Sequence, residues 1–113
     1  MSSVPAEKYE SEAKKDGFIL YSGVDEEDGV KHVCHFNTKN GTFHTEQNDE
    51  GAIFKVVGVL LWQDNGQYNA IPYWTWDNEG SEWVAAEPEG AEKYDLSGPE
   101  IVFADEYELQ RKN

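Results

Sequence analysis

Apolar and polar residues alternate along most of the chain, in short runs bounded by Gly, Pro, Asn and Asp roughly every 8 to 12 positions. A period of two is typical of strands that bury one face. The pattern predicts strands at 17–24, 30–37, 42–47, 52–63, 68–76, 82–87 and 101–109. Residues 88–100 lie between the last two of these strands and, with two prolines and two glycines, are predicted to be irregular.

The N-terminal residues follow a different pattern. Pro5 suits the first turn of a helix, Glu10 and Lys14 have helical spacing, and Gly17 would end the helix. The sequence therefore predicts a polar N-terminal segment, 1–16, with a short helix, followed by a single β domain, 17–113.

Turn signals link consecutive strands, which indicates hairpins throughout. The runs are separated by two Asn-Gly pairs and by three acidic turns that each end in Gly, at 25–29, 48–51 and 77–80. We therefore predict an all-β fold, a six- to seven-stranded antiparallel meander. A small SH3-like or barrel-like roll is the first expectation, and an antiparallel sandwich is the alternative.

The turn at Asn40-Gly41 predicts which side chains share a face. A two-residue loop would pair His35 with Glu46 and place His44 beside them on a polar, wet face. Cys34 and its neighbours of the same parity would then face the core.

The second Asn-Gly pair, at 65–66, predicts the pairing of the two most apolar strands. Val57 would face Trp74, and Gly58 would face Tyr73. Pro72 lacks a backbone donor, which predicts an edge or a bulge at that point.

Two histidines and a carboxylate on one face are legitimate ligands for Zn²⁺ or Fe²⁺, so His35, His44 and Glu46 form a candidate metal cluster. The simpler interpretation is a cross-strand His–Glu pair, because no motif with metal-ligand spacing accompanies them. We predict no metal and no cofactor.

The charge is strongly one-sided, with 23 acidic and 9 basic residues and a formal net charge of −14. Such a chain repels nucleic acid and anionic membranes, whereas a basic protein surface complements it. The polar beginning of the sequence has no apolar stretch of signal-peptide or membrane-spanning length, from which we expect a cytoplasmic protein, or one of the host cytoplasm if it is viral.

Acidic residues dominate the second half of the chain, where they surround the segment PYWTWDNEGSEW (72–83). Aromatic anchors within an acidic surface suit a partner-binding face. The predicted partner-binding residues are Trp76, Asp77, Glu79, Glu82, Trp83, Glu87, Glu89 and Glu92.

No catalytic or nucleotide-binding signature occurs, so we predict a non-enzymatic protein. It would engage a basic surface, such as that of a nucleic-acid-binding protein, as an inhibitor, an anti-defence or immunity protein, or a DNA mimic of phage or bacterial origin. One alternative is a carbohydrate-binding module with an aromatic platform, although Trp62 and Trp74 are expected in the core. Another is a small structural subunit of a virion or other assembly.

Overall fold

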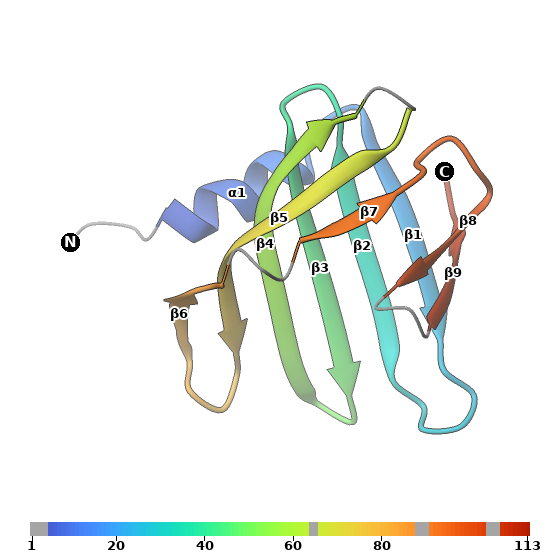
Figure 1. Cartoon of the computed structure of the whole chain (residues 1–113). Coiled ribbons are helices and arrows are strands. Elements are labelled where there is room, and N and C mark those ends of the chain that lie inside the picture. Colours follow the sequence, from blue (N-terminus) through green and yellow to red (C-terminus); the bar gives the residue numbers. More distant parts are fainter. Residues whose placement is uncertain (1–4, 64–65, 88–90, 104–106) are drawn as a thin grey trace.

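The fold is all-β with a short N-terminal helix, as predicted. A computed structural model describes residues 5–63, 66–87, 91–103 and 107–113 (Figure 1). Its elements are α1 (Pro5–Ala13), β1 (Phe18–Val24), β2 (Lys31–Asn37), β3 (Thr42–Asp49), β4 (Ala52–Trp62), β5 (Tyr68–Asp77), β6 (Glu82–Ala85), β7 (Glu92–Tyr94), β8 (Glu100–Phe103) and β9 (Tyr107–Arg111).

The strands described here form one antiparallel sheet in the order β6-β5-β4-β3-β2-β1-β9-β8, and β7 pairs with β5. The meander prediction is therefore correct for β1 to β6. It was incomplete further on, because residues predicted as the single strand 101–109 contribute to two strands, and the stretch 88–100 contains β7. A single sheet replaces the alternative of two packed sheets.

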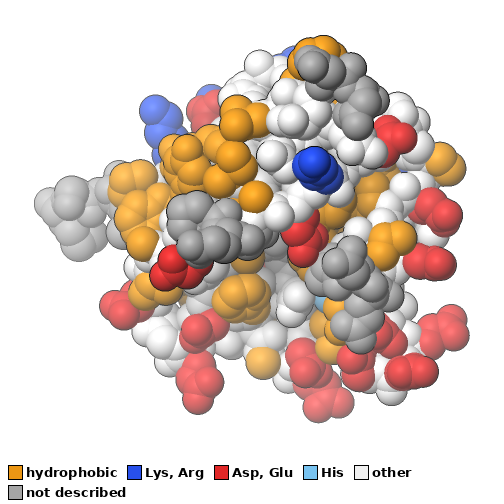
Figure 2. Space-filling view, in the orientation of Figure 1, with side chains coloured by type: hydrophobic (Ala, Val, Ile, Leu, Met, Phe, Trp, Pro, Cys, Tyr) orange, Lys and Arg blue, Asp and Glu red, His pale blue; other side chains and the backbone are white. Residues whose placement is uncertain are grey.

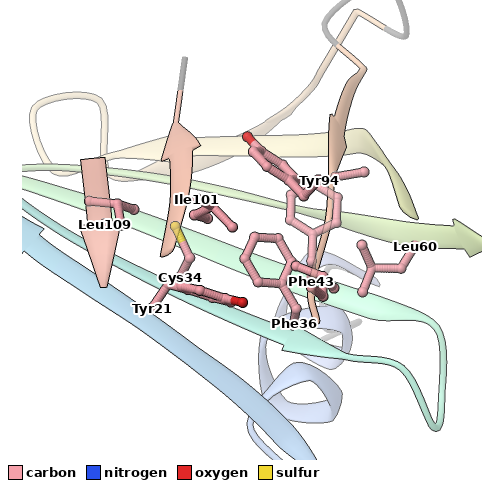
Figure 3. Close-up of a cluster of buried hydrophobic side chains, with 10 residues drawn as sticks. Tyr21, Cys34, Phe36, Phe43, Leu60, Tyr94, Ile101 and Leu109 are labelled. Carbon is pink, nitrogen blue, oxygen red and sulfur yellow. The ribbon is translucent and has the colours of Figure 1, made fainter. Parts of the chain in front are cut away.

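The sheet curls, so that strands far apart in its order face each other. Figure 1 shows β7 crossing in front of β2 and β3, while α1 lies behind β3 and β4. The rings of Tyr94 in β7 and Phe103 in β8 stack with centroids 6.5 Å apart. In the core, side chains from β1, β2 and β3 pack against Tyr94 of β7. They include Tyr21, Cys34 and Phe36 (Figure 3). We call this concave side of the sheet the inner face.

Helix α1 covers the opposite side, the outer face. Ala6 and Ala13 are fully buried, because a methyl group lets the helix approach the sheet closely. The buried amide of Asn37 donates to the carbonyl oxygens of Glu12 and Lys15, at 3.3 and 3.1 Å. These bonds satisfy carbonyls that a helix end leaves without intrahelical partners. The outer face of β3 is thus covered by protein, and the prediction of a wet face there was wrong.

The pairing of β2 with β3 differs from the predicted register by two residues. His35 lies opposite His44, and Asn37 lies opposite Thr42, so four residues form the turn. The side chain of Asn37 explains the longer turn, since its Oδ1 accepts hydrogen bonds from the N–H groups of Lys39 and Asn40. A shift of two residues preserves the faces, and Cys34 and Phe36 are buried on the inner face as expected.

A bulge interrupts the pairing of β4 with β5. Val57 lies opposite Trp74, as predicted, but Gly58 lies opposite Pro72, which leaves Tyr73 as an extra residue in β5. The expected edge or bulge at Pro72 is confirmed. On the other side of β5, β6 pairs only as far as Trp74 and β7 begins opposite Ala70, so neither strand pairs with β5 at Pro72.

We predict that Gly58→Ala destabilises the fold strongly. A Cβ at this position would overlap the carbonyl oxygen of Ile71 and lie 3.0 Å from Cε1 of Phe43. Because backbone atoms of a paired strand cannot move aside freely, the free energy of unfolding should fall by about 2–3 kcal/mol. Urea unfolding followed by tryptophan fluorescence measures this loss.

The matched control is Gly98→Ala, whose added Cβ would meet nothing closer than 3.7 Å. Its free energy of unfolding should stay within about 0.5 kcal/mol of the parent. Equal losses in the two variants would contradict the assignment of a steric constraint to Gly58.

Candidate functional site

The acidic turns of the chain gather at one end of the roll. In a meander every second turn lies at the same end, and the connections β1–β2, β3–β4 and β5–β6 lie together there (Figure 1). Figure 2 shows Asp and Glu side chains along the corresponding lower edge of the molecule. We call this region the acidic end. Its described residues are Asp25, Glu26, Glu27, Asp28, Asp49, Glu50, Asp77, Glu79, Glu82 and Glu108.

No basic residue interrupts the three acidic turns, since segments 25–29, 49–51 and 77–82 contain neither Lys nor Arg. Most of their carboxylates are exposed to solvent. Like charges that are held close together strengthen the field outside the protein. The acidic end is therefore a concentrated source of negative potential.

Hydrogen bonds join the turn after β5 to the turn before β4. Asn78 donates from its backbone N to the Ile53 oxygen and accepts at Oδ1 from the Ile53 N–H, both at 3.0 Å. Its Nδ2 also donates to the Gly51 oxygen at 2.7 Å. One asparagine thus fixes two acidic turns relative to each other.

Some carboxylates of the acidic end shape their own turns. Asp25 accepts a hydrogen bond from the N–H of Glu27, and Asp77 accepts one from the N–H of Gly80. Glu79, by contrast, is exposed at the tip of its turn. The tip carboxylates project from a backbone that these neighbouring aspartates hold in place.

The β5–β6 hairpin pairs its two tryptophans across the strands. Trp76 lies opposite Trp83, and Asp77 lies opposite Glu82. The two indole rings are 6.4 Å apart and tilted by 48°. Because neighbouring residues of a strand point to opposite faces, the tryptophans lie on the outer face and the two carboxylates on the inner face.

The predicted partner-binding residues therefore do not form one surface. Trp76 and Trp83 are half-buried on the outer face, where the Lys55 ammonium lies 5.2 Å from the Trp76 ring. Glu87 and Glu92 lie beside a cavity on the inner face. Glu89 is outside the described residues. Asp77, Glu79 and Glu82 belong to the acidic end.

The sequence predicted that Trp62 and Trp74 both lie in the core, and the structure differs for Trp62. Trp74 packs opposite Val57 and is half-buried. Trp62 is 59% exposed, so its assignment to the core was wrong. Trp62 is the last residue of β4, where the strand extends beyond the packed part of the roll.

A buried polar cluster fills the space between α1 and the outer face. Nε2 of His44 lies 3.6 Å from a carboxylate oxygen of Glu46 and 4.0 Å from one of Glu10. Glu10 is paired with Lys55 at 3.1 Å. Burial, together with the nearby charge of Lys14, lowers the pKa of His44 to about 3, although Glu10 opposes the change. His44 is therefore neutral near pH 7.

The candidate metal cluster does not assemble as the predicted register required. His35 lies opposite His44, with ring centroids 5.6 Å apart, and Glu46 lies opposite Val33. Within the described ranges, no group of three or more His, Cys, Asp and Glu side chains could hold a metal ion. The thiol of Cys34 is buried in the core, and burial raises its pKa.

Sequence reasoning missed the acidic end, although a signal was present. The three acidic turns are the first, third and fifth connections of a predicted meander, and alternate connections share one end. Counting charges separately in the two halves of the chain hid the grouping of the three turns, because Asp25 to Asp28 fall in the first half.

Compared with known protein families, curated proteins and solved structures, the sequence and the fold have no significant match. Among the described residues, α1 is too short and too polar to cross a membrane.

We predict that acid destabilises the protein partly through His44. In the unfolded chain this imidazole titrates near pH 6.5, whereas its pKa in the fold is about 3. The unfolded state binds more protons between these values, so stability falls as the pH falls through this window. The contribution reaches about 1.4 kcal/mol per pH unit. Urea unfolding between pH 7 and pH 4 measures the slope.

The variant His44→Gln removes the titrating group and should show a shallower decline. The pKa of Glu10 is also lowered, chiefly through its hydrogen bond to Lys55 acting against burial, so Glu10 adds a loss at more acidic pH. The two effects are separated by comparing the slopes of parent and variant at a pH above the usual pKa of a glutamate, where Glu10 stays ionised in both the folded and the unfolded state. Parallel slopes for parent and variant would show that His44 is not responsible.

Proposed function

We propose that the protein is a non-enzymatic binding protein whose acidic end occupies a basic surface of another macromolecule. The supporting observation is that three acidic turns, free of Lys and Arg, lie side by side at one end of the roll. A surface of this kind attracts a positively charged site and repels bare nucleic acid and anionic membranes.

One exposed base, Lys31 at the start of β2, lies beside the acidic turns, opposite Val24 and Asn48. Two other lysines are engaged at the helix. Lys15 pairs with Glu12 at 2.6 Å, and Lys55 pairs with Glu10, both at the helix. These pairs neutralise carboxylates of α1 on the outer face. The turns keep their charge for an external partner, and complementary fields speed association and select the partner.

Apolar contact area accompanies the charge. Phe54 is 39% exposed on the inner face and lines a shallow groove with Asp77 and Glu79. An aromatic ring surrounded by carboxylates provides a desolvated anchor next to charges that orient the partner. This groove, rather than the Trp76–Trp83 pair, is the part of the acidic end that combines both features.

The partner class that suits this surface is a basic, nucleic-acid-binding protein. Occupation of its site would make the protein an inhibitor, as immunity, anti-defence and DNA-mimic proteins are, and would require both partners in the same compartment, which we propose is the cytoplasm. The carbohydrate-binding and structural-subunit alternatives stay predictions. The tilt between the two tryptophans does not favour the flat platform that a sugar-binding site needs.

Charge removal at the acidic end tests the proposal. We expect the immobilised protein to retain basic proteins from a lysate at low salt and to release them as the salt concentration rises. The variant Glu26→Gln/Glu27→Gln/Glu79→Gln should lose most of this retention, because it neutralises exposed charge in two of the three turns. Quantitative mass spectrometry of each salt fraction gives the readout.

The matched control, Glu7→Gln/Asp16→Asn/Glu100→Gln, removes the same number of exposed charges away from the acidic end. It should keep the parent's partners and salt profile. Equal losses in both variants would mean that net charge alone causes retention, and retention of no basic protein by the parent would exclude the proposed function.

A further inference from the structure

The inner face of the roll holds a second feature, an apolar cavity of about 410 Å³. It lies over β3, β4 and β5, bounded by Phe43 and Val56 from the sheet and by Tyr94 and Phe103 from the strands that curl over it. A volume of this size is typical of sites for small organic molecules. The cavity belongs to the inner face, whereas the charges of the proposed partner surface lie on the turns.

The cavity arises because the edge of β5 is interrupted. The β6 pairing reaches Ala85, and Ala86 still donates its N–H to the Tyr73 oxygen at 2.9 Å, whereas the β7 pairing begins with Glu92 opposite Ala70. The β5 residues of the cavity wall are Ala70, Pro72 and Thr75. Because these side chains are small, they do not fill the space that larger residues occupy elsewhere in the core. These small side chains leave apolar volume that a ligand can occupy.

The polar groups of the cavity are acidic. The carboxylates of Glu87 and Glu92 lie in its wall, and the hydroxyl of Tyr94 donates a hydrogen bond to Glu92. Among the described residues that line the cavity there is no Lys, Arg or His. Carboxylates beside the aromatic side chains of Phe43 and Tyr94 favour a cation over an anion.

We infer that this cavity binds a small amphiphilic cation, with an aromatic or aliphatic body against the apolar wall and an ammonium group at Glu87 and Glu92. An ammonium–carboxylate contact is a charge-assisted hydrogen bond, stronger than one between neutral groups. Anionic ligands of the same shape are repelled by the two carboxylates. The inference does not depend on the proposed function, which uses other residues.

A matched set of probes tests the inference. The compounds 4-phenylbutylammonium, 4-phenylbutanol and 4-phenylbutyrate share one apolar skeleton and differ in charge. At neutral pH we expect the ammonium to bind at least about tenfold more tightly than the alcohol, and the carboxylate to bind most weakly. Calorimetric titration gives the affinities, and amide chemical-shift changes identify the binding site.

Two variants locate the site. Glu87→Gln/Glu92→Gln removes the negative charge and should lower the affinity for the ammonium to about that for the alcohol. Thr75→Phe places a ring in the cavity and should weaken binding of both compounds at least about tenfold. If this variant fails to fold, the charge variant and the shifts of Ala70 and Thr75 decide the question.

The control, Glu26→Gln/Glu27→Gln, removes the same number of charges at the acidic end and should leave ammonium binding unchanged. Failure of the partner proposal would appear in the retention assay, and failure of this inference would appear in the probe titration. The inference is overturned if the ammonium binds no better than the alcohol, if the carboxylate binds best, if no probe binds, or if chemical shifts change only outside the cavity.

Discussion

The close approach of β4 to β5 at Gly58 is the constraint on which the rest of the structure depends. Without a side chain at this position, the backbone of Ile71 can lie against β4, and Tyr73 is left as an extra residue. A bulge bends its strand and increases the local twist. Along the other edge of β5, within the described residues, the pairing of β6 ends at Ala85 and that of β7 begins at Glu92. The curl of the sheet and the inner cavity both follow.

The distribution of charge follows from the meander order of β1 to β6. Alternate turns share an end, so three acidic turns become neighbours and repel one another. The fold withstands this repulsion because short hydrogen bonds fix the turns, above all those of Asn78 to Gly51 and Ile53. Lys31 lies exposed beside these turns, whereas Lys55 is engaged at the helix, where it pairs with Glu10. Carboxylates far outnumber bases at the acidic end, so a net negative field is directed outward.

Local chemistry explains what the sequence could and could not predict. The hairpin of Trp76 and Trp83 was predictable because its register depends only on the turn between the strands. The register of β2 and β3 was not, because the side chain of Asn37 enlarges the turn and also holds the end of α1, a contact between distant segments. The same contact explains why His44 is buried, although alternation alone predicted a wet face.

Tertiary packing accounts for the remaining differences between prediction and structure. Trp62 looked like core by composition but lies beyond the packed part of the roll. The cavity left no mark in the sequence pattern, because small residues such as Ala70 and Thr75 become a cavity wall only when Tyr94 and Phe103 curl over them.

The two proposed sites use the same sign of charge in physically different ways. Glu26 and Glu79 lie in water, so they act over several ångströms and their effect is screened by salt. Glu92 lies half-buried against aromatic rings, where screening is weak and a contacting cation must give up its own hydration. Binding at the acidic end should therefore depend steeply on ionic strength, and binding in the cavity much less. A single acidic protein can in this way carry a surface for macromolecules and a pocket for small cations without one competing with the other.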